Sequence, residues 1–132
     1  MALDSVLSEP DAAFLARMQA DRAATALVSL YLMRHAKSSW EDPSLADIER
    51  PLNQRGRRDA PKMGATFGAR LVPMTFHVSP AERAQRTFRG MRKNWSGLKK
   101  THGVTTPPLY TFDYREVLDW IARQPAETDR LA

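Results

Sequence analysis

The chain has 132 residues, 42% of them hydrophobic and 27% charged, which fits one globular domain. No apolar run approaches the ~20 residues that cross a bilayer, so we expect neither an integral membrane protein nor a membrane partner. The absence of cysteine excludes disulfides and thiolate metal sites. The acidic N-terminus, with Asp4 and Glu9, does not have the pattern of a secretory signal, and we expect a cytoplasmic protein.

Lysine and arginine outnumber acidic residues by 20 to 15, a formal charge of +5 that favours anionic partners. The excess is concentrated in the segment 83–100, which contains no acidic residue. A solvated helix face explains this segment most simply, and a docking surface for a phosphoprotein is the alternative. We expect no nucleic-acid partner because the segment contains no recognised nucleic-acid motif.

The first half of the chain predicts a helix, a strand, a loop and a second helix. Residues 1–25 form a polar extension with helical spacing, and residues 26–132 form the domain. The apolar run 27–33 predicts a strand covered on both faces, and 37–51 is rich in Ser, Asp and Pro and predicts a loop. Asn53 is expected to cap a helix that continues to about residue 71.

The second half repeats the alternation. Residues 74–78 predict a strand, followed by a helix with Ser79 as N-cap, Pro80 in the first position and Glu82 closing a capping box. After a loop over 94–108, residues 109–112 predict a third strand, and Asp113 caps a final helix. This order predicts an α/β fold of three layers, with a mainly parallel sheet flanked by helices.

The candidate site lies where strands end. Arg34 and His35 follow the first strand, and Arg83 lies in the first turn of the helix after the second strand. Ligands of parallel sheets gather beyond these strand ends, and arginine forks bind phosphate oxygens in pairs. A neutral imidazole is a competent nucleophile toward phosphorus. We therefore predict a phosphate site with His35 as nucleophile and Arg34 and Arg83 as clamp, with no metal and no cofactor.

Four segments, "LYLMRHAKSSW", "ERPLNQRGRRDAPKMG", "VSPAERAQRT" and "LYTFDYREVLDWIARQP", resemble in order and spacing the histidine phosphatase superfamily, and within it the SixA-like phosphohistidine phosphatases. The resemblance implies a phosphoglycerate-mutase-like fold, with His35 as nucleophile and Arg34 and Arg83 as phosphate ligands. It also implies removal of phosphate from phosphohistidine on a phosphotransfer protein, or from a small phosphoester, through a phosphohistidine intermediate.

The chain departs from SixA-like sequences at its end. Those sequences continue into a strand with a G-H-N-P segment whose histidine completes the phosphate pocket, whereas His77 and His102 do not match that context. An acidic position of the family is Thr111 here. We therefore expect a C-terminally incomplete domain with weakened activity and a sheet edge open to self-association. Three explanations stay open, namely a truncated chain, completion by a partner, or a non-catalytic module that binds phosphate or phosphoprotein.

Overall fold

The computed structural model describes residues 29–125, 128 and 130–132. The helix expected within residues 1–25 lies outside the described residues, as do the first two residues of the strand expected over 27–33. Four strands and three helices lie within them: β1 (Ser29–Leu30), α2 (Gln54–Gly68), β2 (Phe76–Val78), α3 (Glu82–Arg92), β3 (Gly103–Thr105), α4 (Tyr114–Ala122) and β4 (Arg130–Leu131). Short 3-10 turns span Asp47–Glu49, Lys100–His102 and Pro107–Leu109.

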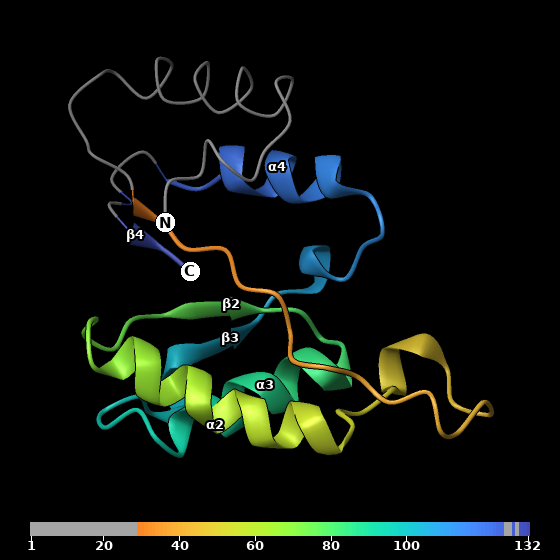
Figure 1. Ribbon diagram of the computed structural model, residues 1–132. Helices are drawn as coiled ribbons and strands as arrows, with labels where there is room; N and C mark the ends of the chain where they lie inside the picture. The colour runs from red at the N-terminus through yellow and green to blue at the C-terminus, as the bar shows by residue number, and fades with distance from the viewer. Residues whose placement is uncertain (1–28, 126–127, 129) are drawn as a thin grey trace.

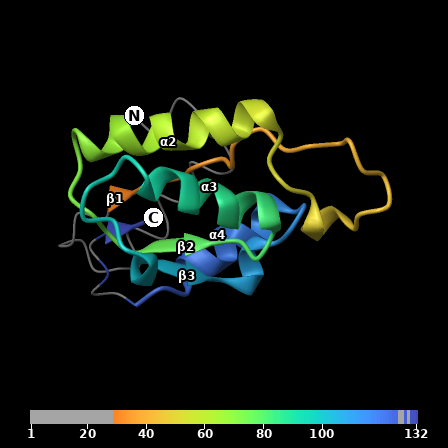
Figure 2. The same ribbon diagram turned by 90° about the horizontal axis from the view of Figure 1, so that it is seen from below.

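The strands form a layer between helices. Helix α4 covers one face, and α2 and α3 lie side by side on the other (Figure 1; Figure 2). Both strand pairings, β1 with β4 and β2 with β3, are parallel. The prediction of an α/β fold with a mainly parallel sheet flanked by helices is confirmed. None of the helices among the described residues is both long enough and apolar enough to cross a membrane.

Strand β4 lies between β1 and β2. In its pairing with β1, Ser29 is opposite Arg130 and Leu30 opposite Leu131, and the Tyr31 N–H donates to the Leu131 carbonyl over 2.8 Å. On its other side, the His77 N–H of β2 donates to the Ala132 carbonyl over 2.6 Å. The strands thus form two parallel pairs, β1 with β4 and β2 with β3, and this hydrogen bond connects the two pairs.

Two of the three predicted helix starts are confirmed. The Asn53 side chain accepts from the Gly56 N–H over 2.8 Å, and the Asp113 side chain accepts from the Arg115 N–H over 3.0 Å. The capping box at Ser79 is wrong, because α3 begins at Glu82 with Ala81 as the residue before it. The Ser79 hydroxyl accepts instead from the Ala81 N–H over 3.2 Å, which shapes the turn that leads into the helix.

The third strand was predicted in the wrong place. Residues 109–112 form no strand, because Pro107 and Pro108 favour a 3-10 turn there and supply no backbone N–H to a ladder. The strand lies earlier, at Gly103–Thr105 within the predicted loop, and its β-branched Val104 and Thr105 pair with His77 and Val78.

The main core lies between β2 and the helix pair. Its buried members are Met74, Phe76, Val78, Phe88, Met91, Trp95 and Leu98. Helices α2 and α3 approach closely because glycine stands at both contact points: a Cβ on Gly64 would collide with the Met91 backbone, and one on Gly90 would lie 2.6 Å from the Ala60 Cβ. This close packing fixes α3, whose first turn carries Arg83, against α2.

Candidate active site

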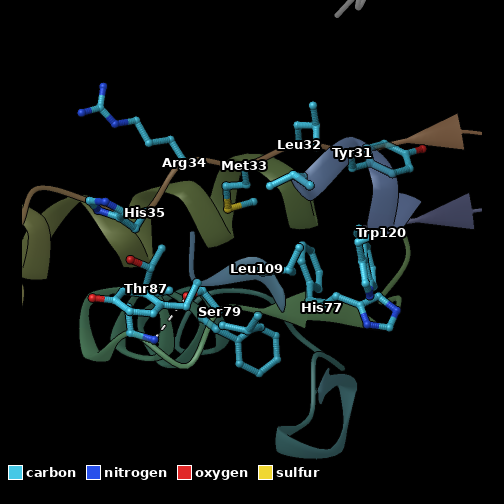
Figure 3. A pocket seen from close by; sticks show the side chains of 18 of the residues that line it. Tyr31, Leu32, Met33, Arg34, His35, His77, Ser79, Thr87, Leu109 and Trp120 are labelled. Atoms are coloured by element: carbon cyan, nitrogen blue, oxygen red, sulfur yellow. Dashed lines mark hydrogen bonds between the residues drawn. The ribbon is translucent and has the colours of Figure 1, made fainter. Parts of the chain in front are cut away.

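The three residues predicted for the site line one cavity. It has a volume of about 440 Å³ and lies between the segment after β1 and the segment around β2. Arg34 and His35 come from the first segment, and Arg83 comes from the first turn of α3, as predicted. Figure 3 shows the labelled side chains that line the cavity, with His35 near Thr87 and Arg34 extending from the opposite side of its backbone.

The His35 ring is oriented by the neighbouring peptide group. Its Nδ1 lies 2.7 Å from the Ala36 carbonyl oxygen. A carbonyl oxygen only accepts hydrogen bonds, so Nδ1 must carry the proton. In the neutral imidazole this leaves the lone pair on Nε2. The backbone thus selects the tautomer that an attacking histidine requires.

Thr87 links the histidine segment to helix α3. Its hydroxyl oxygen accepts from the Ala36 N–H over 3.0 Å and donates to the Arg83 carbonyl over 2.7 Å. Thr87 and Ala36 are both buried, so this hydrogen-bonded connection is shielded from water. It fixes the backbone next to His35 relative to the helix that carries Arg83.

Arg83 is bound to an internal carboxylate. One guanidinium nitrogen donates to the Asp47 carbonyl over 2.7 Å, and the other contacts the Asp47 Oδ2 at 3.0 Å. Arg83 is 8% exposed, so its charge is almost fully withdrawn from solvent and requires such partners. The Arg83 guanidinium is placed to donate hydrogen bonds to oxygen atoms, and Asp47 accepts some of these bonds.

A second arginine secures the loop that presents Asp47. Arg50 donates to the Ser39 carbonyl over 3.0 Å, to the Ser38 hydroxyl over 2.7 Å and to the Asp47 Oδ1 over 3.1 Å. Its guanidinium carbon also lies 3.2 Å from the centroid of the exposed Trp40 ring, a cation–π contact. Arg50 thereby ties both ends of the loop together while itself lying buried.

Tyr110 completes the surroundings of Asp47. Its hydroxyl donates to the Asp47 Oδ2 over 2.9 Å, from the loop that follows β3. This hydrogen bond, together with those from Arg83 and Arg50, holds the pKa of the Asp47 carboxyl below its ordinary value. The same bond raises the pKa of the Tyr110 phenol, because phenolate would face the carboxylate. Asp47 is therefore an anion at neutral pH.

His77 lies on the wall of the same cavity, at the end away from His35 (Figure 3). Its Nδ1 lies 3.1 Å from the Thr106 hydroxyl, and its ring makes an edge contact with Trp120 at 4.8 Å between centroids. Burial lowers the pKa of the His77 imidazole. These contacts connect β2 to Thr106, directly after β3, and to α4, so His77 supports the packing of the fold.

The three predicted residues share a cavity but are not in direct contact. Among the described residues no hydrogen bond joins Arg34, His35 and Arg83 to one another, and Arg34 is exposed at the rim. Sequence reasoning missed Asp47, Thr87 and Tyr110. The i,i+3 spacing of Asp47 and Arg50 was a signal for an ion pair within the loop. No local pattern could have placed Tyr110 against a residue 63 positions earlier.

The described residues hold no group of three or more His, Asp or Glu side chains placed to bind a metal ion.

The sequence matches one protein family. A family model described as histidine phosphatase superfamily, branch 1, covers residues 30–105. An uncharacterized chloroplastic protein of Arabidopsis thaliana is 34% identical over 83 residues, which are 62% of this chain and 38% of that protein. The residues that the family model covers include Arg34, His35 and Arg83.

Solved structures resemble this fold. A structure titled "putative phosphohistidine phosphatase SixA", from Agrobacterium tumefaciens, has a TM-score of 0.65 and 27% identity over 77% of this chain and 64% of that one. Another SixA structure, from Nakamurella multipartitia, has a TM-score of 0.61 and 27% identity over 82% and 58% of the two chains. A protein histidine phosphatase SixA complexed with tungstate shares the fold at a TM-score of 0.62 and 20% identity, over 77% and 65% of the two chains. The chain thus spans less than two thirds of each of these relatives.

Proposed function

The chain belongs to the histidine phosphatase superfamily, and on that premise we propose that it removes phosphate from phosphohistidine on a phosphotransfer protein. The observation that carries the proposal is the orientation of His35, whose Nδ1 faces the Ala36 carbonyl and leaves Nε2 free for attack. The SixA names of the similar structures favour phosphohistidine over other phosphate compounds.

The proposed reaction has two displacements at phosphorus. His35 Nε2 forms a bond to phosphorus while the bond to the leaving imidazole breaks and its electron pair returns to that ring, which takes a proton from solvent. Water then attacks the phosphorus of phospho-His35, releases inorganic phosphate and restores the neutral ring. Arg34 and Arg83 stabilise the charge on the equatorial oxygens. A phosphoester with a poor leaving group needs a proton donor, and this chain has Thr111 at the acidic position of the family. Such an ester should react more slowly, because general acid catalysis is worth ~10²–10⁴-fold in rate.

The test is a trapping experiment with a phosphohistidine protein and an aryl phosphate as substrates. We expect the wild-type protein to gain one phosphoryl group that is labile in acid and stable in base, and His35→Ala to gain none. His102→Ala is the matched control, because His102 lies in the 3-10 turn Lys100–His102, away from the cavity. Full turnover by His35→Ala would show that another group attacks phosphorus.

A second function is favoured by the pairing of Arg83 with Asp47. A phosphate ligand must compete with this carboxylate, so the pocket could bind phosphoprotein without turning it over. Binding of phosphate by the wild type, with hydrolysis of neither substrate, would establish this function. Arg34→Ala should then weaken phosphate binding. Arg89→Ala is the control and should leave phosphate binding unchanged, because Arg89 is exposed and lies outside the cavity.

A further inference from the structure

Positive charge is concentrated in the part of the chain that forms α2, β2, α3 and β3. Residues 54–105 contain twelve Lys and Arg side chains and two acidic side chains. The other described residues are almost balanced, with six Lys and Arg against seven Asp and Glu. The positive charge of the described chain therefore lies on the side of the sheet that α2 and α3 cover (Figure 1).

The outward faces of α2 and α3 carry most of these cations. On α2 the buried residues Gly56, Ala60 and Gly64 recur every four positions, so the opposite side of the helix faces water. Helix α3 has the same division between buried and exposed positions, and it lies beside α2 (Figure 2). We call the exposed cations of the two helices the basic helix face: Arg55, Arg57, Arg58, Lys62, Arg86, Arg89 and, directly after α3, Lys93.

Helices α2 and α3 contain two acidic residues, and both are already paired. The Asp59 carboxylate contacts the Arg55 guanidinium at 3.3 Å. The Glu82 carboxylate contacts Arg86 at 2.6 Å and Arg89 at 3.5 Å, so two guanidinium groups share one counter-charge. These carboxylates leave most of the basic helix face without an opposite charge.

The remaining cations of this face repel one another. Among the residues that the structure describes, no acidic side chain lies within 4.0 Å of Arg58, Lys62 or Lys93. Arg58 and Lys62 are four positions apart, as are Arg89 and Lys93, and like charges at this spacing destabilise a helix. An anionic partner would relieve these repulsions.

The helix dipoles do not account for the cations of α2. A helix C-terminus favours positive charge, which explains Lys93 at the end of α3. The N-terminus of a helix disfavours positive charge, yet Arg55, Arg57 and Arg58 lie in or directly after the first turn of α2, which contains no acidic residue. These arginines therefore lower the stability of the helix that carries them, and a role outside the folded chain explains their presence.

The composition of the face indicates the chemistry of the partner. The exposed large hydrophobic side chains of the described chain all lie outside α2 and α3. The face thus has no apolar side chains to enter a membrane and no exposed aromatic rings to stack on bases. Two helices side by side, each ~10 Å across, are also too wide for the ~12 Å major groove of DNA. Arginine forks bind carboxylates in pairs, so a carboxylate-rich protein surface is the best match.

We propose that the basic helix face binds a carboxylate-rich surface of a partner protein. The proposal uses charge and exposure outside the cavity, and it holds whether or not the cavity hydrolyses phosphate. In the folded chain the cations of α2 lie beside the basic segment 83–100, so the binding surface is wider than that segment alone.

The experiment uses the full chain, labelled with ¹⁵N, and a synthetic helical peptide that repeats the sequence Glu-Ala-Ala-Glu-Ala. The matched control peptide has Gln in place of every Glu. We expect saturable binding of the Glu peptide, no binding of the Gln peptide, and amide chemical-shift changes confined to α2 and α3. Added salt should weaken binding, because the face is exposed to solvent.

A pair of double variants locates the binding surface. Arg58→Gln combined with Lys62→Gln should weaken peptide binding about fivefold to tenfold. The matched control is Arg115→Gln combined with Arg123→Gln, which removes the same charge from exposed positions at α4, across the sheet (Figure 1). Binding by this control should change less than about twofold. Circular dichroism verifies that both proteins are folded, and equal weakening by the two would show that only net charge attracts the peptide.

Three further outcomes would overturn the proposal. Shift changes confined to the cavity residues Arg34, His35 and Arg83 would assign the acidic peptide to the phosphate site. Tighter binding of a DNA duplex of equal charge, or of phosphatidylserine vesicles, would assign the face to a different class of partner. The absence of saturable binding of the Glu peptide would show that this face is merely solvated.

Discussion

The Asp47 carboxylate lies 3.0 Å from the Arg83 guanidinium. The arginine that the sequence predicts to bind phosphate is therefore already paired with a carboxylate of the same chain. Asp47→Asn removes the competing charge and keeps the side-chain size. We expect inorganic phosphate to bind about twofold to fivefold more tightly, in line with the small energies of ion pairs that water still reaches, because the Asp47 side chain is 34% exposed. The free energy of unfolding should fall, because the buried Arg83 loses a charged partner.

The matched control for Asp47→Asn is Asp59→Asn, which removes a carboxylate paired with Arg55 on the exposed face of α2. It should change neither phosphate affinity nor stability appreciably. Calorimetry gives the affinities, and urea titration gives the stabilities. Weaker phosphate binding by Asp47→Asn would show that Asp47 organises Arg83 for the ligand rather than competing with it.

Tyr110→Phe tests the cause of the lowered Asp47 pKa. The folded-state pKa lies below the ordinary value, so Asp47 contributes stability above about pH 4, and this contribution is lost as pH falls through the folded pKa. Without the Tyr110 hydroxyl the pKa rises toward the ordinary value, and the loss should begin at a higher pH. The measurement is the carboxyl carbon chemical shift of Asp47 as a function of pH in both proteins. Coincident titration curves would rule out the Tyr110 hydrogen bond as the principal cause.

Thr87→Val should impair catalysis through His35. The change deletes the acceptor of the buried Ala36 N–H, at a cost of about 1–3 kcal/mol in stability. Because the ring bonds to the same residue, its misplacement should lower kcat by about tenfold to a hundredfold, with a smaller effect on KM. Thr87→Ser should restore most of kcat. Thr66→Val is the control, since the Thr66 hydroxyl donates to the Lys62 carbonyl on the exposed side of α2. If Thr87→Val lowered kcat only as much as its loss of stability explains, and Thr87→Ser did not restore kcat, a positioning role for Thr87 would be contradicted.

His77 should make stability depend on pH near neutrality. Burial lowers its folded-state pKa below about 6.5, so the neutral ring contributes stability above pH 6.5, which is lost as pH falls through the folded pKa. Urea titrations of the wild type and His77→Gln at pH 7.5 and 5.5 should give a stability difference that is larger at pH 7.5. His102→Gln should retain the pH dependence, because His77 is intact. A difference independent of pH would contradict the effect of burial.

Gly90→Val should separate α2 from α3. A Cβ at this position would already lie 2.6 Å from the Ala60 Cβ, and a β-branched side chain adds further crowding. We expect a loss of about 1–3 kcal/mol in the free energy of unfolding, measured with urea. Gly68→Val, near the end of α2 beside the Trp95 side chain, is exposed and should cost less. Equal losses would mean that helix propensity, and not the close approach, sets the cost.

The fold class was predictable because periodicity and caps are local signals. Asn53 and Asp113 mark the starts of α2 and α4 in the sequence, and Arg83 lies in the first turn of α3 as expected. Strand positions were less predictable, since Gly103–Thr105 is short and becomes a strand only by pairing with β2. The site was predictable for residues at strand and helix ends. Asp47 and Tyr110 meet across 63 positions, and only the tertiary fold brings them together.

The pairing of β4 with β1 has a consequence for the order of folding. Strands β2 and β3 and helices α2 and α3 all lie between residues 54 and 105, so their contacts close short loops. Strand β4 pairs Leu131 with Leu30, about a hundred positions away, so this contact closes a much longer loop. We therefore expect the 54–105 unit to form first and the pairing of β1 with β4 to form after it. In pulse-labelled hydrogen exchange, amides of α3 should gain protection before the amide of Tyr31, and the reverse order would refute this sequence of events.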